Sequence, residues 1–241
     1  MNEASYEVTS KQHSSTFYEG VKDCIPTLIG YLSIGFAAGV VGAASNLSII
    51  EVTLLSALVY AGASQFIICA LLVAGSPVAV ILFTTFIVNV RHLLLCMTLA
   101  PHFKSYSLLK NIGIGALVTD ETFGVAAHKL ASKQSINDRW MNGLNVSAYL
   151  FWIAASMLGA GFGKWIANPE ALGLDFSLTA MFIALLVLQL QTVERSKLMF
   201  YLSIMAYVVI LMLLLCMVVP SYIAVILSTI IGATIGVLKE Q

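Results

Sequence analysis

The stretch PVAVILFTTFIVNVRHLLLCMTLA, residues 77–100, decides the class of fold. Arg91 is its single formal charge, and the stretch is as long as a helix that crosses a bilayer, which needs about 20 mostly apolar residues. In the wider segment from Cys24 to Pro101, the only other formal charge is Glu51. This part of the chain therefore predicts a series of helices that span a membrane.

The composition of the whole chain agrees with this prediction. Of its 241 residues, 59% are apolar and 10% charged, and the mean hydropathy is +0.94, whereas soluble domains are about 45–50% apolar and about 25% charged. These values exclude a soluble enzyme, a disordered protein and a secreted disulfide-rich module. The 12 basic residues balance the 12 acidic ones, so no charge excess favours nucleic acid as a partner. The four cysteines lack the paired spacing of zinc or redox sites, and we predict neither a metal nor a cofactor.

Turn residues and polar stretches divide the chain into an all-α, polytopic membrane protein with about eight transmembrane helices. Residues 1–23 are expected to form a polar cytoplasmic tail, and 24–241 a single transmembrane transport domain. The expected spans are 24–44, 51–74, 77–100, 111–128, 143–166, 176–191 and 198–218, with an eighth that ends near Leu238.

The positive charges predict the orientation of these spans, because cytoplasmic loops carry an excess of Lys and Arg. With eight simple spans, one side of the membrane holds only Lys104, Lys110 and Lys164. The other side holds Lys11, Lys22, Lys129, Lys133, Arg139, Arg195, Lys197 and Lys239. Both termini are therefore expected in the cytoplasm.

Two features of the apolar segments indicate a transporter rather than a plain bundle. Glu51 precedes Gln65 by the same spacing as Asp175 precedes Gln189, and each pair follows a glycine-rich span. This match predicts an internal repeat of parallel orientation, and many transporters are built from repeats. The run YAGASQF, residues 60–66, predicts a broken helix, because Gly62 lets the backbone unwind and leaves amide groups for a substrate. The alternative is a helix-packing face of small residues.

Ionisable side chains at membrane depth are expensive and therefore indicate function. Arg91 lies far from both ends of its span, and Asn89 and His92 share one face beside it. Arg91 either binds a carboxylate, from a substrate or from an internal acid, or holds helix ends through their carbonyl groups.

Asp120 and Glu121 interrupt another apolar segment. They point about 100° apart on a helix, so both cannot face one groove equally. One of them is expected at a helix N-terminus, where the helix dipole favours an anion, and either could carry a proton. The alternative places both at the membrane interface.

Four motifs in order, AGASQF (61–66), NVRHLL (89–94), TDE (119–121) and LDFSLTAMF (174–182), resemble those of AzlC-type permeases, the large subunits of bacterial branched-chain amino acid exporters. The chain departs from the family pattern before Gln189, where we expect a proline. The resemblance implies efflux of leucine, isoleucine, valine and similar neutral amino acids from the bacterial cytoplasm across the inner membrane. It also implies a small, four-span partner of the AzlD type.

The resulting hypothesis is a proton-coupled secondary exporter that is not an enzyme. Its candidate substrate and proton pathway consists of Gly62, Ser64, Gln65, Asn89, Arg91, His92, Asp120, Glu121 and Gln189. The alternatives are a passive channel or a structural membrane subunit. An intramembrane hydrolase is disfavoured because Ser64 has only His92 as a conceivable base within the apolar spans.

Overall fold

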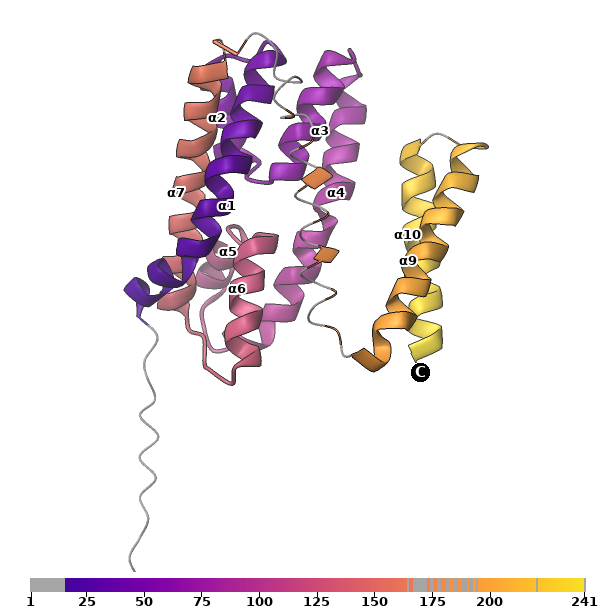
Figure 1. Cartoon of the computed structure of the whole chain (residues 1–241). Helices are drawn as coiled ribbons and strands as arrows, with labels where there is room; N and C mark the ends of the chain where they lie inside the picture. The colour runs from indigo at the N-terminus through magenta and orange to yellow at the C-terminus, as the bar shows by residue number, and fades with distance from the viewer. Residues whose placement is uncertain are drawn as a thin grey trace, which may run out of the picture. The chain divides into compact units, whose positions relative to one another are not determined.

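The computed structural model describes residues 16–163, 195–219 and 221–240, together with isolated positions between 164 and 194. Within these residues all regular structure is helical (Figure 1). The chain divides into two compact units, Met1–Leu178 and Thr179–Gln241. The expected span 176–191 falls largely outside the described residues, as do Asp175 and Gln189, so the predicted repeat between residues 51–65 and 175–189 stays a prediction.

Four of the described helices are long and apolar enough to cross a bilayer. In the first unit these are α1 (Phe17–Ala44), α4 (Val78–Leu99), which continues into the 3₁₀ helix η1 (Ala100–Phe103), and α7 (Asp138–Gly163). In the second unit it is α9 (Arg195–Cys216). These helices confirm the all-α membrane class.

Helix α1 begins earlier than the sequence suggested. Thr16 caps it, because its side chain accepts a hydrogen bond from the Glu19 amide at 3.2 Å while the Glu19 carboxylate accepts one from the Thr16 amide at 2.9 Å. The expected tail, residues 1–23, therefore already becomes helical at Phe17.

Helices α1 and α7 run parallel and touch through their backbones. Gly20 lies against the Trp140 carbonyl near one end of the pair, and Gly39 lies against the Ser156 carbonyl near the other. A side-chain carbon at either glycine would overlap these oxygens. Small residues at such contacts let transmembrane helices approach closely. Among the described helices of the first unit, this pair is the most extensively packed.

The segment expected as the span 51–74 is instead a helical hairpin. Helix α2 (Ile49–Leu58) starts where α1 ends, with Val52 against Gly42, and runs to the middle of the unit. Helix α3 (Gly62–Val73) then returns to the same end, where Cys69 contacts Ser45 (Figure 1). With 10 and 12 residues, each helix is too short to cross a bilayer. The predicted break in this segment is confirmed, but the crossing is not.

A second hairpin enters from the opposite end and replaces the expected span 111–128. Helix α5 (Leu108–Gly115) starts beside the first residue of α7, where Lys110 pairs with Asp138 at 2.6 Å. Helix α6 (Asp120–Ala131) returns to that end, where Lys129 pairs with Asp23 of α1 at 3.1 Å (Figure 1). We call residues 59–61 the first tip and residues 116–119 the second tip.

The two hairpins change which loops share a side. Because α5 and α6 together return to their starting end, Lys104 and Lys110 lie at the same end of the first unit as Lys129, and not opposite it as eight simple spans require. The helix α4 between the hairpins consequently runs antiparallel to α1 and α7 (Figure 1). The sequence did not reveal this because each hairpin has the length and hydropathy of one ordinary span.

The second unit contains the hairpin of α9 and α10 (Ser221–Glu240), which matches the expected seventh and eighth spans. Small residues recur every fourth position on α10, at Ala224, Ser228 and Gly232, and all three are buried. Gly232 lies against Val208 of α9. The hairpin is thus joined by close packing of small residues, as is common between helices in lipid.

Candidate functional site

The first tip is a break in the helical backbone that is buried in protein. Tyr60 adopts a left-handed conformation with φ 43°, and Ala61 is extended before α3 begins at Gly62. Tyr60 and Ala61 are 8% and 5% exposed. Irregular backbone at membrane depth is tolerated only where protein or a cavity surrounds it. No side chain caps the start of α3, so its first amide groups point into the unit without a side-chain acceptor.

Val118 and Thr119 of the second tip are buried as well, and the helix that follows is capped. Thr119 accepts a hydrogen bond from the Thr122 amide, and its own amide donates to the Thr122 hydroxyl at 2.9 Å. Helix α6 therefore begins with Asp120 and Glu121 in its first turn, where the helix dipole stabilises both carboxylates. The expectation that one of them lies at a helix N-terminus is confirmed.

Tyr31, in the middle of α1, joins the second tip to a tryptophan of α7. Its hydroxyl donates to Glu121 Oε2 at 2.9 Å and lies 2.8 Å from Thr119 Oγ1, which leaves Thr119 as the donor of that second bond. Its ring packs edge-on against Trp152, with centroids 5.0 Å apart. Trp152 Nε1 in turn donates to Gln65 Oε1 in α3 at 3.2 Å. A continuous chain of contacts thus links the two hairpins.

Helix α4 holds both hairpins as well. Ser64 of α3 donates to Asn89 Oδ1 at 2.9 Å, and Arg91 pairs with Asp120 of α6 at 2.9 Å between Nη2 and Oδ2. Three of the motifs found in the sequence therefore meet here. Of the alternatives for Arg91, the structure contains the internal acid as its partner.

The two adjacent carboxylates have different surroundings. Asp120 turns toward α4 and Arg91, whereas Glu121 turns toward α1 and Tyr31. The expected divergence of the pair is confirmed. Among the residues that the structure describes, no Lys, Arg or His lies within salt-bridge distance of Glu121.

The side chains of Gln65 and His92, also in this region, differ in their hydrogen bonding. The amide nitrogen of Gln65 is buried and, within the described part of the chain, makes no hydrogen bond, although its oxygen is bonded to Trp152. His92 is half-buried, and its ring hydrogen-bonds to the backbone of Asn89 on its own helix. The structure therefore gathers Gln65 into the centre but places His92 along α4.

Sequence reasoning missed Tyr31 and Trp152. Both are aromatic residues in glycine-rich helices, and aromatic residues are common in membrane spans. The one cue in the sequence was the glycine at position 62. The Trp152 ring packs against Gly62 so closely that it would lie 2.9 Å from a side-chain carbon there. A small residue at a break can thus indicate a large aromatic side chain on a neighbouring helix.

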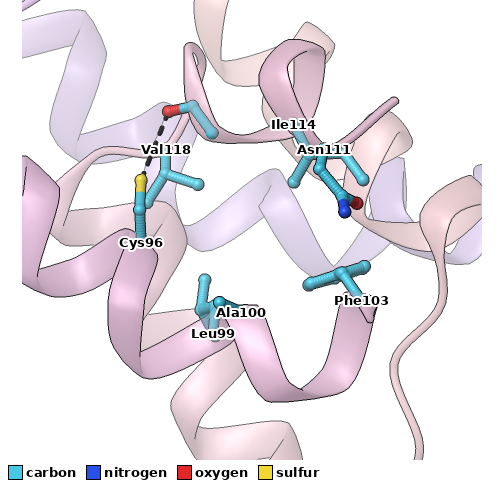
Figure 2. Close-up of a pocket in the computed structure, with 8 residues that line it drawn as sticks. Cys96, Leu99, Ala100, Phe103, Asn111, Ile114 and Val118 are labelled. Atoms are coloured by element: carbon cyan, nitrogen blue, oxygen red, sulfur yellow. Dashed lines mark hydrogen bonds between the residues drawn. The ribbon is translucent and has the colours of Figure 1, made fainter. Parts of the chain in front are cut away.

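A cavity of about 170 Å³ lies beside the second tip (Figure 2). It lies between the end of α4, η1 and α5, is open on one side, and has a mostly apolar lining. Its polar groups are the Cys96 thiol, which donates to the Gly115 carbonyl at 3.5 Å, and the Asn111 amide. The lining residues are Cys96, Leu99, Ala100, Phe103, Asn111, Ile114, Gly115 and Val118.

The amino-acid sequence is similar to those of known membrane proteins. The family model described as AzlC protein matches residues 26–166, which includes both hairpins. The inner membrane protein YgaZ of Escherichia coli is 34% identical over 189 residues, which cover 74% of this chain and 75% of that protein.

Two other relatives are more distant. The branched-chain amino acid transport protein AzlC of Bacillus subtilis is 28% identical and matches 68% of this chain and 64% of its own length. An uncharacterized membrane protein of Archaeoglobus fulgidus is 27% identical over 74% of this chain and 78% of that protein. No solved structure gives a significant match.

Proposed function

Because the chain belongs to the AzlC family, we propose that it exports branched-chain and related neutral amino acids across the bacterial cytoplasmic membrane. The substrate class is that of the Bacillus subtilis relative, which is named a branched-chain amino acid transport protein. It further includes coupling to protons, a small four-span partner of the AzlD type and one transport domain formed by residues 24–241.

The observation that carries this proposal is the convergence of two half-helix N-termini, those of α3 and α6, in the middle of the first unit. Transporters often hold the charged ends of a substrate at such half-helices, because the positive end of the dipole and the free amides are placed there without a bulky side chain. A zwitterionic amino acid needs one such half-helix N-terminus for its carboxylate and a hydrogen-bond acceptor for its ammonium group.

The surroundings of the two tips suggest how these roles divide. The uncapped start of α3, with Gly62, Ser64 and the unbonded amide nitrogen of Gln65, supports binding of the carboxylate. Glu121, held by Tyr31, supports binding of the ammonium or of a proton. Asn89 and Arg91 would act indirectly, by holding Ser64 and Asp120.

The transport proposal predicts leucine export that depends on the full-length chain. In cells preloaded with a leucine-containing dipeptide, expression with the small partner should raise leucine efflux well above that of alanine, and dissipation of the proton gradient should slow it. Proteoliposomes preloaded with leucine should also accelerate uptake of labelled leucine by exchange, which a passive pore does not do. Efflux equal to that of cells without the protein contradicts the proposal.

We further propose that the end of the first unit rich in basic residues faces the cytoplasm. Apart from Arg91, every described Lys and Arg of this unit lies at that end, whereas the loops after α1 and α3 have none. The residues are Lys22, Lys104, Lys110, Lys129, Lys133 and Arg139. This distribution follows the positive-inside rule more closely than the simple spans did.

Single cysteines in a cysteine-free chain test this orientation. Ala74 and Ser105 are exposed at opposite ends of α4. A membrane-impermeant maleimide added to intact cells should label Ala74→Cys and leave Ser105→Cys unlabelled until the cells are opened. Eight simple spans predict the reverse pattern, so labelling of Ser105→Cys alone would contradict the hairpins.

A further inference from the structure

The cavity at the end of α4 has the size and lining of a site for a small aliphatic group. Apolar cavities of roughly 150 Å³ bind benzene in other proteins, and this one measures about 170 Å³. The four-carbon side chain of leucine is smaller than benzene and therefore fits. Leu99, Phe103, Ile114 and Val118 supply the apolar walls.

The cavity is also bordered by a side chain with an acceptor that the described residues do not use. The side-chain oxygen of Asn111 is buried and accepts no hydrogen bond from the described residues, while its nitrogen donates to the Tyr106 carbonyl at 3.5 Å. A buried acceptor without a partner is unfavourable unless a water or a ligand supplies the donor. An ammonium group is such a donor.

The position of the cavity connects it with the second tip. Val118, which lines it, directly precedes Thr119, the cap of α6 and the residue that bonds Tyr31. The cavity lies between the end of α4, at the basic end of the first unit, and the second half of α5. A substrate that arrives from this end reaches the cavity next to the start of α6, which carries Glu121.

From these observations we infer that the cavity lined by Cys96, Phe103, Asn111 and Gly115 binds the branched side chain of the amino acid, with its ammonium on Asn111, and selects the substrate before it reaches the tips. This inference rests on the proposed export of amino acids. It assigns the preference for branched side chains to α4, η1 and α5, and not to the half-helix ends that hold the charged groups common to all amino acids.

Selection by this cavity has a calculable size. Each buried methylene changes affinity roughly fourfold, so leucine, with three carbons more than alanine, should bind roughly 60-fold more tightly. Gly115→Leu should remove most of this difference, because its side chain would start in contact with Cys96 Sγ, at 3.5 Å, and fill the cavity. Gly113→Leu is the matched control, since Gly113 lies on the same helix and faces open space.

Binding of labelled leucine and alanine to the purified full-length chain tests the inference. Gly115→Leu should weaken leucine binding at least tenfold and alanine binding no more than about twofold, while Gly113→Leu changes neither. Equal leucine affinity in the two variants would overturn the inference while leaving the transport proposal intact. Absence of leucine binding by the unmodified chain would overturn both.

The native thiol in the cavity provides a second readout that needs no packing change there. In a chain with Cys24, Cys69 and Cys216 replaced by alanine, leucine should slow maleimide labelling of Cys96, and glycine should not. The control carries Gly113→Cys with Cys96→Ala, so that its thiol lies on α5 but outside the cavity. Protection of both thiols, or of neither, would contradict binding in the cavity.

Discussion

Gly39→Leu is expected to prevent the protein from accumulating in the membrane. The new side chain would have to occupy the space of the Ser156 carbonyl and the Ala160 amide, which belong to the backbone of α7 and cannot rotate away. Overlap of this kind falls in the exceptional class of substitutions that cost about 4 kcal/mol or more. The amount of full-length protein in isolated membranes, measured by immunoblot, should fall below a tenth of the unmodified level.

The matched control is Gly30→Leu. Gly30 also lies on α1, but a side chain there meets no other atom within 4 Å. This variant should accumulate normally and unfold at an unchanged temperature after solubilisation. If Gly39→Leu and Gly30→Leu accumulated equally, the close contact of α1 and α7 would be wrong.

Glu121→Gln should strongly weaken transport while the protein still accumulates. Glutamine has nearly the same shape and can still accept a hydrogen bond from Tyr31, so the second tip should keep its structure. It cannot bind a proton and interacts more weakly with an ammonium group. Hydrogen bonds to charged groups contribute about 1.5–3 kcal/mol, so apparent affinity for leucine should fall roughly 10- to 100-fold. Export should also lose its dependence on the proton gradient.

Asp120→Asn is expected to lower the amount of protein in the membrane, which is a different defect from that of Glu121→Gln. It removes the carboxylate that pairs with Arg91, and Arg91 and Asp120 have only 27% and 17% of their side chains exposed. Loss of one member of a largely buried pair is more harmful than loss of both. Accumulation should therefore fall in Asp120→Asn and recover when Arg91→Met is added. Recovery of Glu121→Gln by Arg91→Met would contradict this division of roles.

The class of fold could be predicted from the sequence because hydropathy depends on each residue separately. The direction of a short apolar helix cannot be predicted in this way, because the segment of α2 and α3 has the same composition whether it crosses the bilayer or turns back. What decides the outcome is the local conformation of Tyr60 and Ala61 and the side chains that cover them. Gly62 indicated the break but contained no information on its angle.

The candidate site could be predicted in part for a related reason. Arg91 and Asp120 were conspicuous because charges are rare within the apolar segments. Their pairing depends on where α4 and α6 lie, which the sequence alone did not reveal. Tyr31 and Trp152 have no unusual sequence context, and they matter only because the folded chain places them between the two hairpins.

The backbone contact between α1 and α7 limits how the first unit can change shape. Two helices that meet through glycine and carbonyl groups cannot slide without breaking contacts along their whole length, so they form a fixed frame. The two hairpins join this frame at opposite ends of the unit, and both are also bonded to it in the middle, through Tyr31 to Glu121 and through Trp152 to Gln65. A movement of either hairpin against the frame therefore has to break polar bonds to α4 and to the frame itself.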